Sequence, residues 1–149
     1  MKKYFTAVVF LLLVDQLSKY WANESLADAS YSLLPFFSLT LVYNHGAAFS
    51  FLADMGGWQR YFLSSISIVA SIVIAIWMLR TALQYRLKLL SLTLILAGAL
   101  GNMVDRVLHG FVIDFIHLHH GNFHFPIFNF ADGLISIGVV LLLIADWKQ

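Results

Sequence analysis

Four apolar stretches of bilayer length constrain the fold of this chain more than any other feature of its sequence. They run from Tyr4 to Trp21, Tyr61 to Leu79, Leu89 to Leu108 and Phe130 to Trp147. A transmembrane helix needs about 20 predominantly apolar residues, with a range of about 17 to 25. With 60% hydrophobic and 11% charged residues, the composition lies outside the soluble globular range. The sequence therefore predicts an α-helical integral membrane protein with four transmembrane helices, in one domain over residues 1–149.

The first stretch has a second interpretation, because Lys2 and Lys3 precede an apolar run, as in a secretory signal peptide. No small-x-small cleavage site follows, and the apolar pattern continues to Trp21. A membrane span is therefore the preferred interpretation.

Basic residues predict the orientation of the four spans. If the spans alternate in direction, six of the nine basic residues fall on the side that carries both termini. Short loops rich in Lys and Arg face the cytoplasm, so both termini are predicted to be cytoplasmic. The segments 23–59 and 109–129 then face outward. The six residues are Lys2, Lys3, Arg80, Arg86, Lys88 and Lys148.

Both outward segments contain a period-2 pattern typical of half-buried strands, at residues 37–44 and 111–118. A small extracytoplasmic β-sheet resting on the membrane is therefore predicted. The second strand would carry Asp114 on the same side as apolar neighbours, so we expect this carboxyl to be partly desolvated and to favour its protonated form.

Two aspartates, Asp114 and Asp132, lie at the mouths of apolar segments. An acid in hydrocarbon costs roughly 2.5 to 3.5 kcal/mol or more, so such groups are kept when they are paired or used. Two carboxyls that share one proton are typical of aspartic peptidases. Asn129 precedes Asp132 by three residues, which predicts a helix N-cap at the start of the last span. Asp105 is not expected to partner Asp114, because a continuing helix would separate them by about 13 Å.

The third span carries small and polar residues at spacings that place them on one helical face. Two interpretations stay open for this stripe: close packing with a buried Asp-Arg pair, or a set of side chains that holds the site. The stripe consists of Gly98, Gly101, Asn102, Asp105 and Arg106.

Asp15 and Lys19 are four residues apart in the first span, acid first, which favours an intrahelical ion pair. We expect them to neutralise one another and extend toward the outward surface. The alternative is that one contacts a substrate head group or orients the outer loop. Asn44 and Gly46 belong to the stretch 44–50, whose small residues would let a bound peptide approach the backbone closely.

Metal and serine chemistry are both disfavoured by the sequence. His117, His119, His120 and His124 have no spacing with a defined ligand geometry, so no metal and no other cofactor is expected. The serines of the second span lack a placed base and a nucleophile turn.

Five motifs in order give the chain a close resemblance to lipoprotein signal peptidase, the bacterial signal peptidase II. The resemblance spans nearly the whole chain. The motifs are Asp15-x-x-Ser18-Lys19, Asn44-x-Gly46-Ala47-Ala48-Phe49-Ser50, Gly98-Ala99-Leu100-Gly101-Asn102-x-x-Asp105-Arg106, Gly110-x-Val112-x-Asp114-Phe115 and Phe128-Asn129-x-Ala131-Asp132.

The resemblance implies a multi-pass aspartic endopeptidase of the bacterial cytoplasmic (inner) membrane, with its active site toward the periplasmic or outer face. Such an enzyme cleaves prolipoproteins on the N-terminal side of a diacylglyceryl-modified cysteine. Asp114 and Asp132 would be the catalytic pair. The implied partners are these prolipoproteins, membrane lipid and globomycin-type inhibitors, with no nucleic acid. The substrate-binding or supporting residues would be Asn44, Gly46, Gly98, Asn102, Asp105, Arg106, Asn129, Asp15 and Lys19.

Two other functions compete with the peptidase. Ionisable residues within spans also mark ion pathways, so a proton-coupled membrane carrier is the main alternative. The absence of an inverted repeat and the outward position of most acids argue against it. A non-catalytic membrane assembly factor would keep its function after Asp114→Asn.

Overall fold

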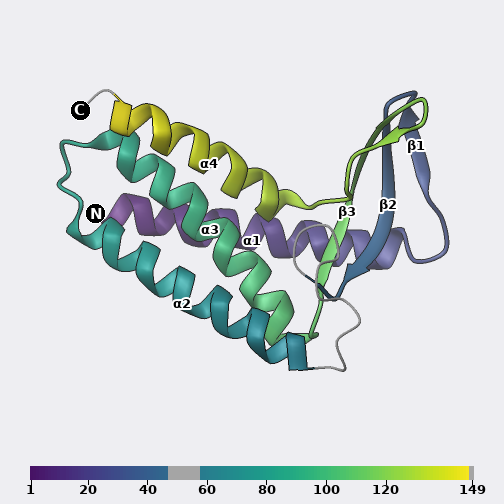
Figure 1. The fold of residues 1–149 in the computed structure, drawn as a ribbon, viewed down its shortest axis with the longest axis horizontal. Coiled ribbons are helices and arrows are strands. Elements are labelled where there is room, and N and C mark those ends of the chain that lie inside the picture. Colours follow the sequence, from purple (N-terminus) through teal and green to yellow (C-terminus); the bar gives the residue numbers. More distant parts are fainter. Residues whose placement is uncertain (47–57, 148–149) are drawn as a thin grey trace.

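The computed structural model describes residues 1–46 and 58–147, which form four long helices and a four-stranded sheet at one end of them (Figure 1). The helices are α1 Lys2–Ser25, α2 Trp58–Arg80, α3 Arg86–Leu108 and α4 Phe130–Trp147. The strands are β1 Tyr31–Leu34, β2 Phe37–Asn44, β3 Val112–His120 and β4 Phe123–His124.

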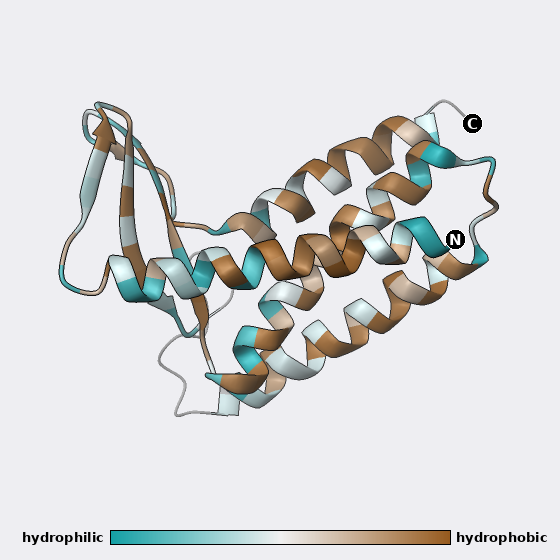
Figure 2. Cartoon of the chain, turned by 180° about the vertical axis from the view of Figure 1, so that it is seen from behind, coloured by the Kyte–Doolittle hydropathy of each residue, from teal (hydrophilic) through white to brown (hydrophobic). Residues whose placement is uncertain are grey.

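The four helices confirm the predicted membrane architecture. Within the described residues, each is long and apolar enough to cross a bilayer. Figure 2 shows hydrophobic residues along the middle of the helices and hydrophilic ones toward their ends. The 24 residues of α1 make it about 36 Å long, longer than a hydrocarbon core of about 30 Å. Its last turn therefore extends past the predicted end at Trp21, toward the sheet.

Helix α3 is the centre of the bundle and packs against each of the other three helices (Figure 1). In its most apolar window 56% of the residues are buried, against 17–22% in the other helices. Because α3 faces protein on most sides, it can carry polar side chains that lipid would not tolerate.

Glycines allow α3 and α4 to approach closely. A Cβ added to Gly98 of α3 would collide with the carbonyl oxygen of Ala131, and one added to Gly138 of α4 would lie 2.6 Å from Ile95 Cγ1. Only residues without a side chain fit such contacts, as is typical of membrane helix pairs. This packing places the start of α4 against the polar end of α3.

The sheet confirms the strands predicted in both outward segments. Its order is β1-β2-β3-β4, and all neighbours are antiparallel. The β2–β3 register pairs Leu39 with Ile116 and then shifts, so that Val42 pairs with Asp114. Asn44 consequently lies diagonally across from Asp114, within reach of its carboxylate.

Two connections hold the sheet at one end of the helix bundle. Phe115 of β3 packs with Ala22 and Leu26 at the end of α1. Between α3 and β3 the chain turns at Gly110, whose φ of 85° is a conformation that glycine adopts readily. The sheet therefore lies at the end of the bundle opposite Met1 and the α2–α3 connection (Figure 1).

Candidate active site

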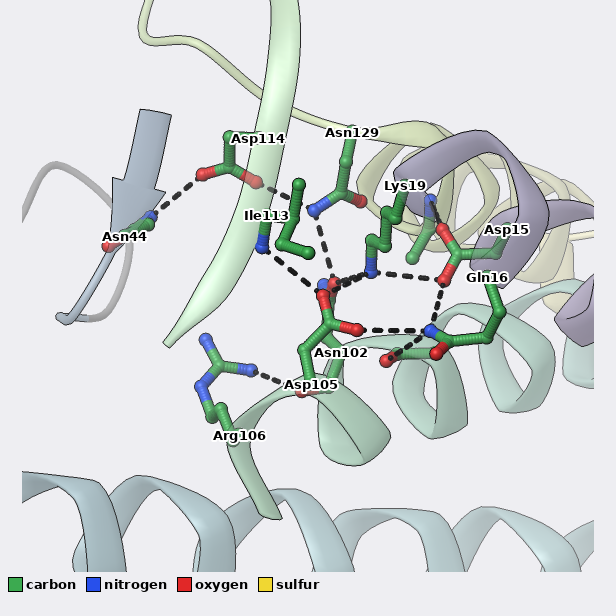
Figure 3. A network of polar contacts seen from close by, with 12 residues as sticks. Asp15, Gln16, Lys19, Asn44, Asn102, Asp105, Arg106, Ile113, Asp114 and Asn129 are labelled. Carbon is green, nitrogen blue, oxygen red and sulfur yellow. Dashed lines mark hydrogen bonds and ion pairs between the residues drawn. The ribbon is translucent and has the colours of Figure 1, made fainter. Parts of the chain in front are cut away.

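Asp114 is held by amide groups from two directions at the membrane end of the sheet. Its Oδ2 accepts a hydrogen bond from Asn44 Nδ2 at 3.0 Å, and its Oδ1 accepts one from Asn129 Nδ2 at 2.7 Å (Figure 3). The residue is 2% exposed. The pKa of Asp114 is raised from 3.8 to about 6, chiefly by burial and also by the charge of Asp132, against the lowering effect of the two amide hydrogen bonds and of Lys19. The expected desolvation of this carboxyl is confirmed.

Asp132 belongs to a reciprocal cap at the start of α4. Its backbone N–H donates to Asn129 Oδ1 at 3.0 Å, and its Oδ2 accepts from the backbone N–H of Asn129 at 3.2 Å. This pairing is the capping box that the sequence predicted, with aspartate in place of the usual Glu or Gln. The cap directs both side chains toward the end of α3.

Asn102 of α3 connects the two aspartates. Its Nδ2 donates to Asp132 Oδ1 at 2.8 Å, and its Oδ1 accepts from Asn129 Nδ2 at 3.2 Å. Asn129 in turn donates to Asp114, so two amides link two carboxylates that come from different elements. Within the described residues neither Asp114 nor Asp132 forms an ion pair, so both carboxylates are hydrogen-bonded without being neutralised directly.

A buried ion cluster of Asp15, Lys19 and Asp105 lies next to the Asn102 amide (Figure 3). Lys19 Nζ is 3.0 Å from Asp15 Oδ2 and 2.9 Å from Asp105 Oδ2. The predicted pair of Asp15 and Lys19 forms, but its predicted outward extension is wrong, because the two residues are 0% and 1% exposed. The acceptors offered by α3 hold the ammonium inside the bundle, where a buried charge must be paired.

The polar stripe of α3 divides between two surroundings, so the alternative of a buried Asp-Arg pair is not what forms. Asp105 pairs with Lys19, whereas Arg106 Nη1 lies 3.4 Å from the Asn102 carbonyl oxygen and 3.5 Å from Ser67 Oγ. The separation of about 13 Å between Asp105 and Asp114 holds for a helix that continues past Leu108, and α3 does not continue. The helix ends at Leu108, the chain folds back, and Asp105 Oδ2 accepts from the Ile113 backbone N–H at 3.2 Å.

Gln16 is a supporting residue that the sequence reasoning missed. Its Nε2 lies 3.0 Å from Asp105 Oδ1, 3.2 Å from Asp15 Oδ2 and 3.2 Å from the Gly101 carbonyl oxygen. A polar residue three positions before Lys19, on the same helical face, was the signal that could have identified it.

Gly101 and Gly46 have separate local roles. A Cβ added to Gly101 would collide with Asp15 Oδ2, so this position brings α1 and α3 together at the ion cluster. The Gly46 backbone N–H donates to Asn44 Oδ1 at 3.1 Å, which turns the Asn44 amide nitrogen toward Asp114. The small residues Ala47, Ala48 and Ser50, predicted to admit a peptide, lie outside the described residues.

Both aspartates open into one cavity of about 860 Å³ between the sheet, α3 and the start of α4. This volume is within the range of about 300 to 1,000 Å³ that is usual for ligand sites. Its polar lining includes Asn44, Asn102, Arg106, Asp114 and Asp132, and its apolar lining includes Val42, Leu118, Phe125, Phe128 and Ile137. A mixed wall of this kind suits a ligand with a polar part and an apolar part.

The four histidines considered for metal binding are on the strands β3 and β4 and are not among the described residues that line this cavity: His117, His119, His120 and His124. His124 Nδ1 is 3.1 Å from His117 Nε2, and His119 Nε2 is 2.8 Å from Ser38 Oγ. Partial burial lowers the pKa of His117, and the two neighbouring imidazoles lower it further. Across residues 1–46 and 58–147, no group of three or more His, Cys, Asp or Glu is placed to hold a metal ion.

Comparisons with known proteins agree on one family. The model of a family described as signal peptidase (SPase) II matches residues 7–148. The lipoprotein signal peptidase of Hydrogenovibrio crunogenus is 44% identical over 140 residues, which cover 93% of this chain and 81% of that protein. The lipoprotein signal peptidase of Pseudoalteromonas translucida is 49% identical over 136 residues, covering 91% and 82%. A solved structure described as a bacterial membrane enzyme superposes with a TM-score of 0.85 at 34% identity, covering 99% of this chain and 89% of that one.

Proposed function

This chain belongs to the signal peptidase II family, and on that premise we propose that Asp114 and Asp132 are its catalytic pair. As a member of this family of aspartic peptidases, it is a multi-pass bacterial membrane enzyme that cleaves signal peptides from prolipoproteins. The same family membership disfavours the proton-coupled carrier. The observation that supports the catalytic pair is the cavity into which the two linked carboxylates open.

The proposed mechanism uses the pair with one proton. Asp132 as carboxylate takes a proton from a water molecule as the water oxygen attacks the scissile carbonyl carbon, while protonated Asp114 donates a hydrogen bond to the carbonyl oxygen. The C–N bond of the resulting tetrahedral intermediate then breaks, and Asp132 gives its proton to the leaving amine nitrogen. General acid-base help of this kind contributes about 10² to 10⁴ in rate. The raised pKa of Asp114 supports its role as the protonated member of the pair, which donates the hydrogen bond. Loss of that proton sets the alkaline limb of the pH profile, although a coupled pair titrates as a unit.

The cavity also supports a proposal about the substrate. We propose that a diacylglyceryl-modified cysteine brings the cleavage site to the pair, with the acyl chains beside the apolar wall that includes Phe128 and Ile137. A lipid anchor at the membrane surface lowers the entropic cost of bringing the two together. Globomycin-type peptides would compete for the same cavity. Asn44, Asn102 and Arg106 would contact the polar part of either ligand.

We further propose that the sheet faces the periplasm or exterior, with both termini in the cytoplasm of the inner-membrane enzyme. Arg80 ends α2 and Arg86 begins α3, so both flank the α2–α3 connection at the end of the bundle opposite the sheet (Figure 1). Their position supports this orientation through the positive-inside rule. The sequence contains no cysteine, so single-cysteine variants report topology directly. An impermeant maleimide added to intact cells, with the outer membrane permeabilised, should label Asp28→Cys and leave Ala82→Cys unlabelled; the reverse would contradict the orientation.

The catalytic proposal is tested with purified enzyme in detergent and a diacylglyceryl-modified prolipoprotein, with cleavage followed on a gel. We expect the parent to cleave and Asp114→Asn and Asp132→Asn to be inactive while they remain folded. Asp28→Asn, at an exposed outward aspartate, is the matched control and should cleave like the parent. Cleavage by either active-site variant at the parent's rate would refute the assignment.

A further inference from the structure

We propose that Lys19, buried in α1, is a positioning residue for the reaction, because it orients the amide chain that holds both catalytic aspartates. This inference rests on the proposed function of Asp114 and Asp132. It concerns how those two carboxylates are held, and it gives a defined role to a charge that the mechanism itself does not use.

The hydrogen-bonding capacity of Lys19 is filled by three acceptors. An ammonium group has three N–H donors and no acceptor. Lys19 Nζ lies 3.0 Å from Asp15 Oδ2, 2.9 Å from Asp105 Oδ2 and 2.9 Å from Asn102 Oδ1. The two aspartates hold the ammonium in place, and the third donor is directed at Asn102.

That third donor determines which way the Asn102 amide faces. A cation can only contact the amide oxygen, so the NH2 group of Asn102 must point the other way, where it donates to Asp132 Oδ1 at 2.8 Å. A flipped amide would place its NH2 against the ammonium and its oxygen against the Asp132 carboxylate. Both contacts would be repulsive.

The same oxygen orients a second amide. Asn102 Oδ1 also accepts from Asn129 Nδ2 at 3.2 Å, and Asn129 donates its other N–H to Asp114 Oδ1 at 2.7 Å. Asn129 Oδ1 is then left to accept from the Asp132 backbone N–H. One buried cation in α1 thus orients one amide donor on each carboxylate, Asn102 on Asp132 and Asn129 on Asp114.

Lys19 acts without entering the cavity. Among the described residues that line it are Asn102, Asp114 and Asp132 but not Lys19, which is 1% exposed. Replacing Lys19 should therefore change kcat and the proton affinity of the pair Asp114 and Asp132, and it should change substrate binding little. Its positive charge also opposes the burial that raises the pKa of Asp114.

The test compares Lys19→Met with Lys88→Met, each assayed for kcat, KM and the pH profile of kcat/KM. Lys88 is a matched control, because it also pairs with an aspartate, Asp146 at 2.8 Å, but lies at the far end of the helices. For Lys19→Met we expect kcat to fall about 100-fold, the loss typical of misplaced catalytic groups. KM should stay within about twofold of the parent, and the alkaline limb should move to higher pH. Lys88→Met should match the parent.

Asn102→Asp is the second variant, and it keeps the proposal testable if Lys19→Met does not fold. An aspartate at 102 can still accept from Lys19 but cannot donate to Asp132, so the alkaline limb should again move to higher pH with a large loss of kcat. Thermal unfolding and size-exclusion chromatography in detergent verify that each variant is folded.

Three outcomes would overturn the role of Lys19. They are parental kcat in folded Lys19→Met, a loss of activity with an unmoved pH profile, and a parental profile in folded Asn102→Asp. Failure of the proposed function has a different signature, because Asp114→Asn or Asp132→Asn would then remain active whatever Lys19 does.

Discussion

Replacing Asn129 separates two contributions that one buried side chain makes to this enzyme. Asn129 is 0% exposed, caps α4 through its Oδ1, and donates from Nδ2 to Asp114 and Asn102. Asn129→Ser keeps a side-chain oxygen for the cap and loses the amide donor. Asn129→Ala loses both, so the pair of variants isolates the cap from the donor.

The magnitudes follow from the bonds that are removed. An N-cap contributes about 0.5 to 2 kcal/mol, and a hydrogen bond to a charged group about 1.5 to 3 kcal/mol. Asn129→Ala should therefore lower the free energy of unfolding by about 2 to 5 kcal/mol, and Asn129→Ser by about 1 kcal/mol less than that. Because the hydrogen bond from Asn129 lowers the pKa of Asp114 against the effect of burial, both variants should raise that pKa above about 6.

The assay combines chemical unfolding in detergent with kcat/KM measured across pH. Both variants should shift the alkaline limb to higher pH by a similar amount. Their free energies of unfolding should differ, because only Asn129→Ser keeps the cap of α4. A serine variant with the parental pH profile would refute the argument that Asn129 holds the proton equilibrium of Asp114. Equal stabilities of the two variants would refute the role of its oxygen as a cap.

Three further predictions concern stability and packing. The raised pKa of Asp114 means that the folded state holds this proton more tightly, so the stabilisation is present below about pH 4 and lost as pH rises through about 6. Relative to Asp114→Asn, the parent should lose up to about 3 kcal/mol over that interval, as measured by thermal unfolding at several pH values. Gly101→Ala places a methyl group against Asp15 and should lower the free energy of unfolding by about 1 to 3 kcal/mol. At Gly133 an added methyl group meets no atom within 4 Å, so Gly133→Ala should not lower the free energy of unfolding. Equal melting temperatures of the two variants would contradict this difference. Lys88→Met removes a partly exposed ion pair and should change the free energy of unfolding by less than about 1 kcal/mol, so a larger loss in chemical unfolding would be inconsistent with its position.

Local patterns in the sequence were sufficient to predict much of the fold. Apolar length predicts the four helices, because the bilayer requires about 20 such residues of each. Alternation predicts β2 and β3, and the spacing of Asn129 and Asp132 predicts the cap, because both ends of that interaction lie within one helical turn. These features depend on neighbours a few positions away, so the chain itself contains the information.

The contacts around Lys19 were beyond sequence reasoning. The ion pair with Asp15 is local, but its direction depends on whether another helix offers acceptors. Asp105 and Asn102 of α3 offer them, and they turn the ammonium into the bundle instead of toward water. The role of Gln16 depends on the same approach of α1 to α3, which Gly101 permits.

The sequence by itself determined the membrane class, the strands β2 and β3 and the cap of α4, because hydropathy, alternation and capping act over a few residues. Only the tertiary structure decided how Asp114 and Asp132 are held. The shift in register opposite Asp114, the fold-back after Leu108 and the amide chain from Lys19 depend on contacts between distant segments. So does the hydrogen bond from the Ala131 backbone N–H to Asp15 Oδ1, which joins residues 116 positions apart. Their geometry follows from helix packing in three dimensions, and no short-range pattern encodes it.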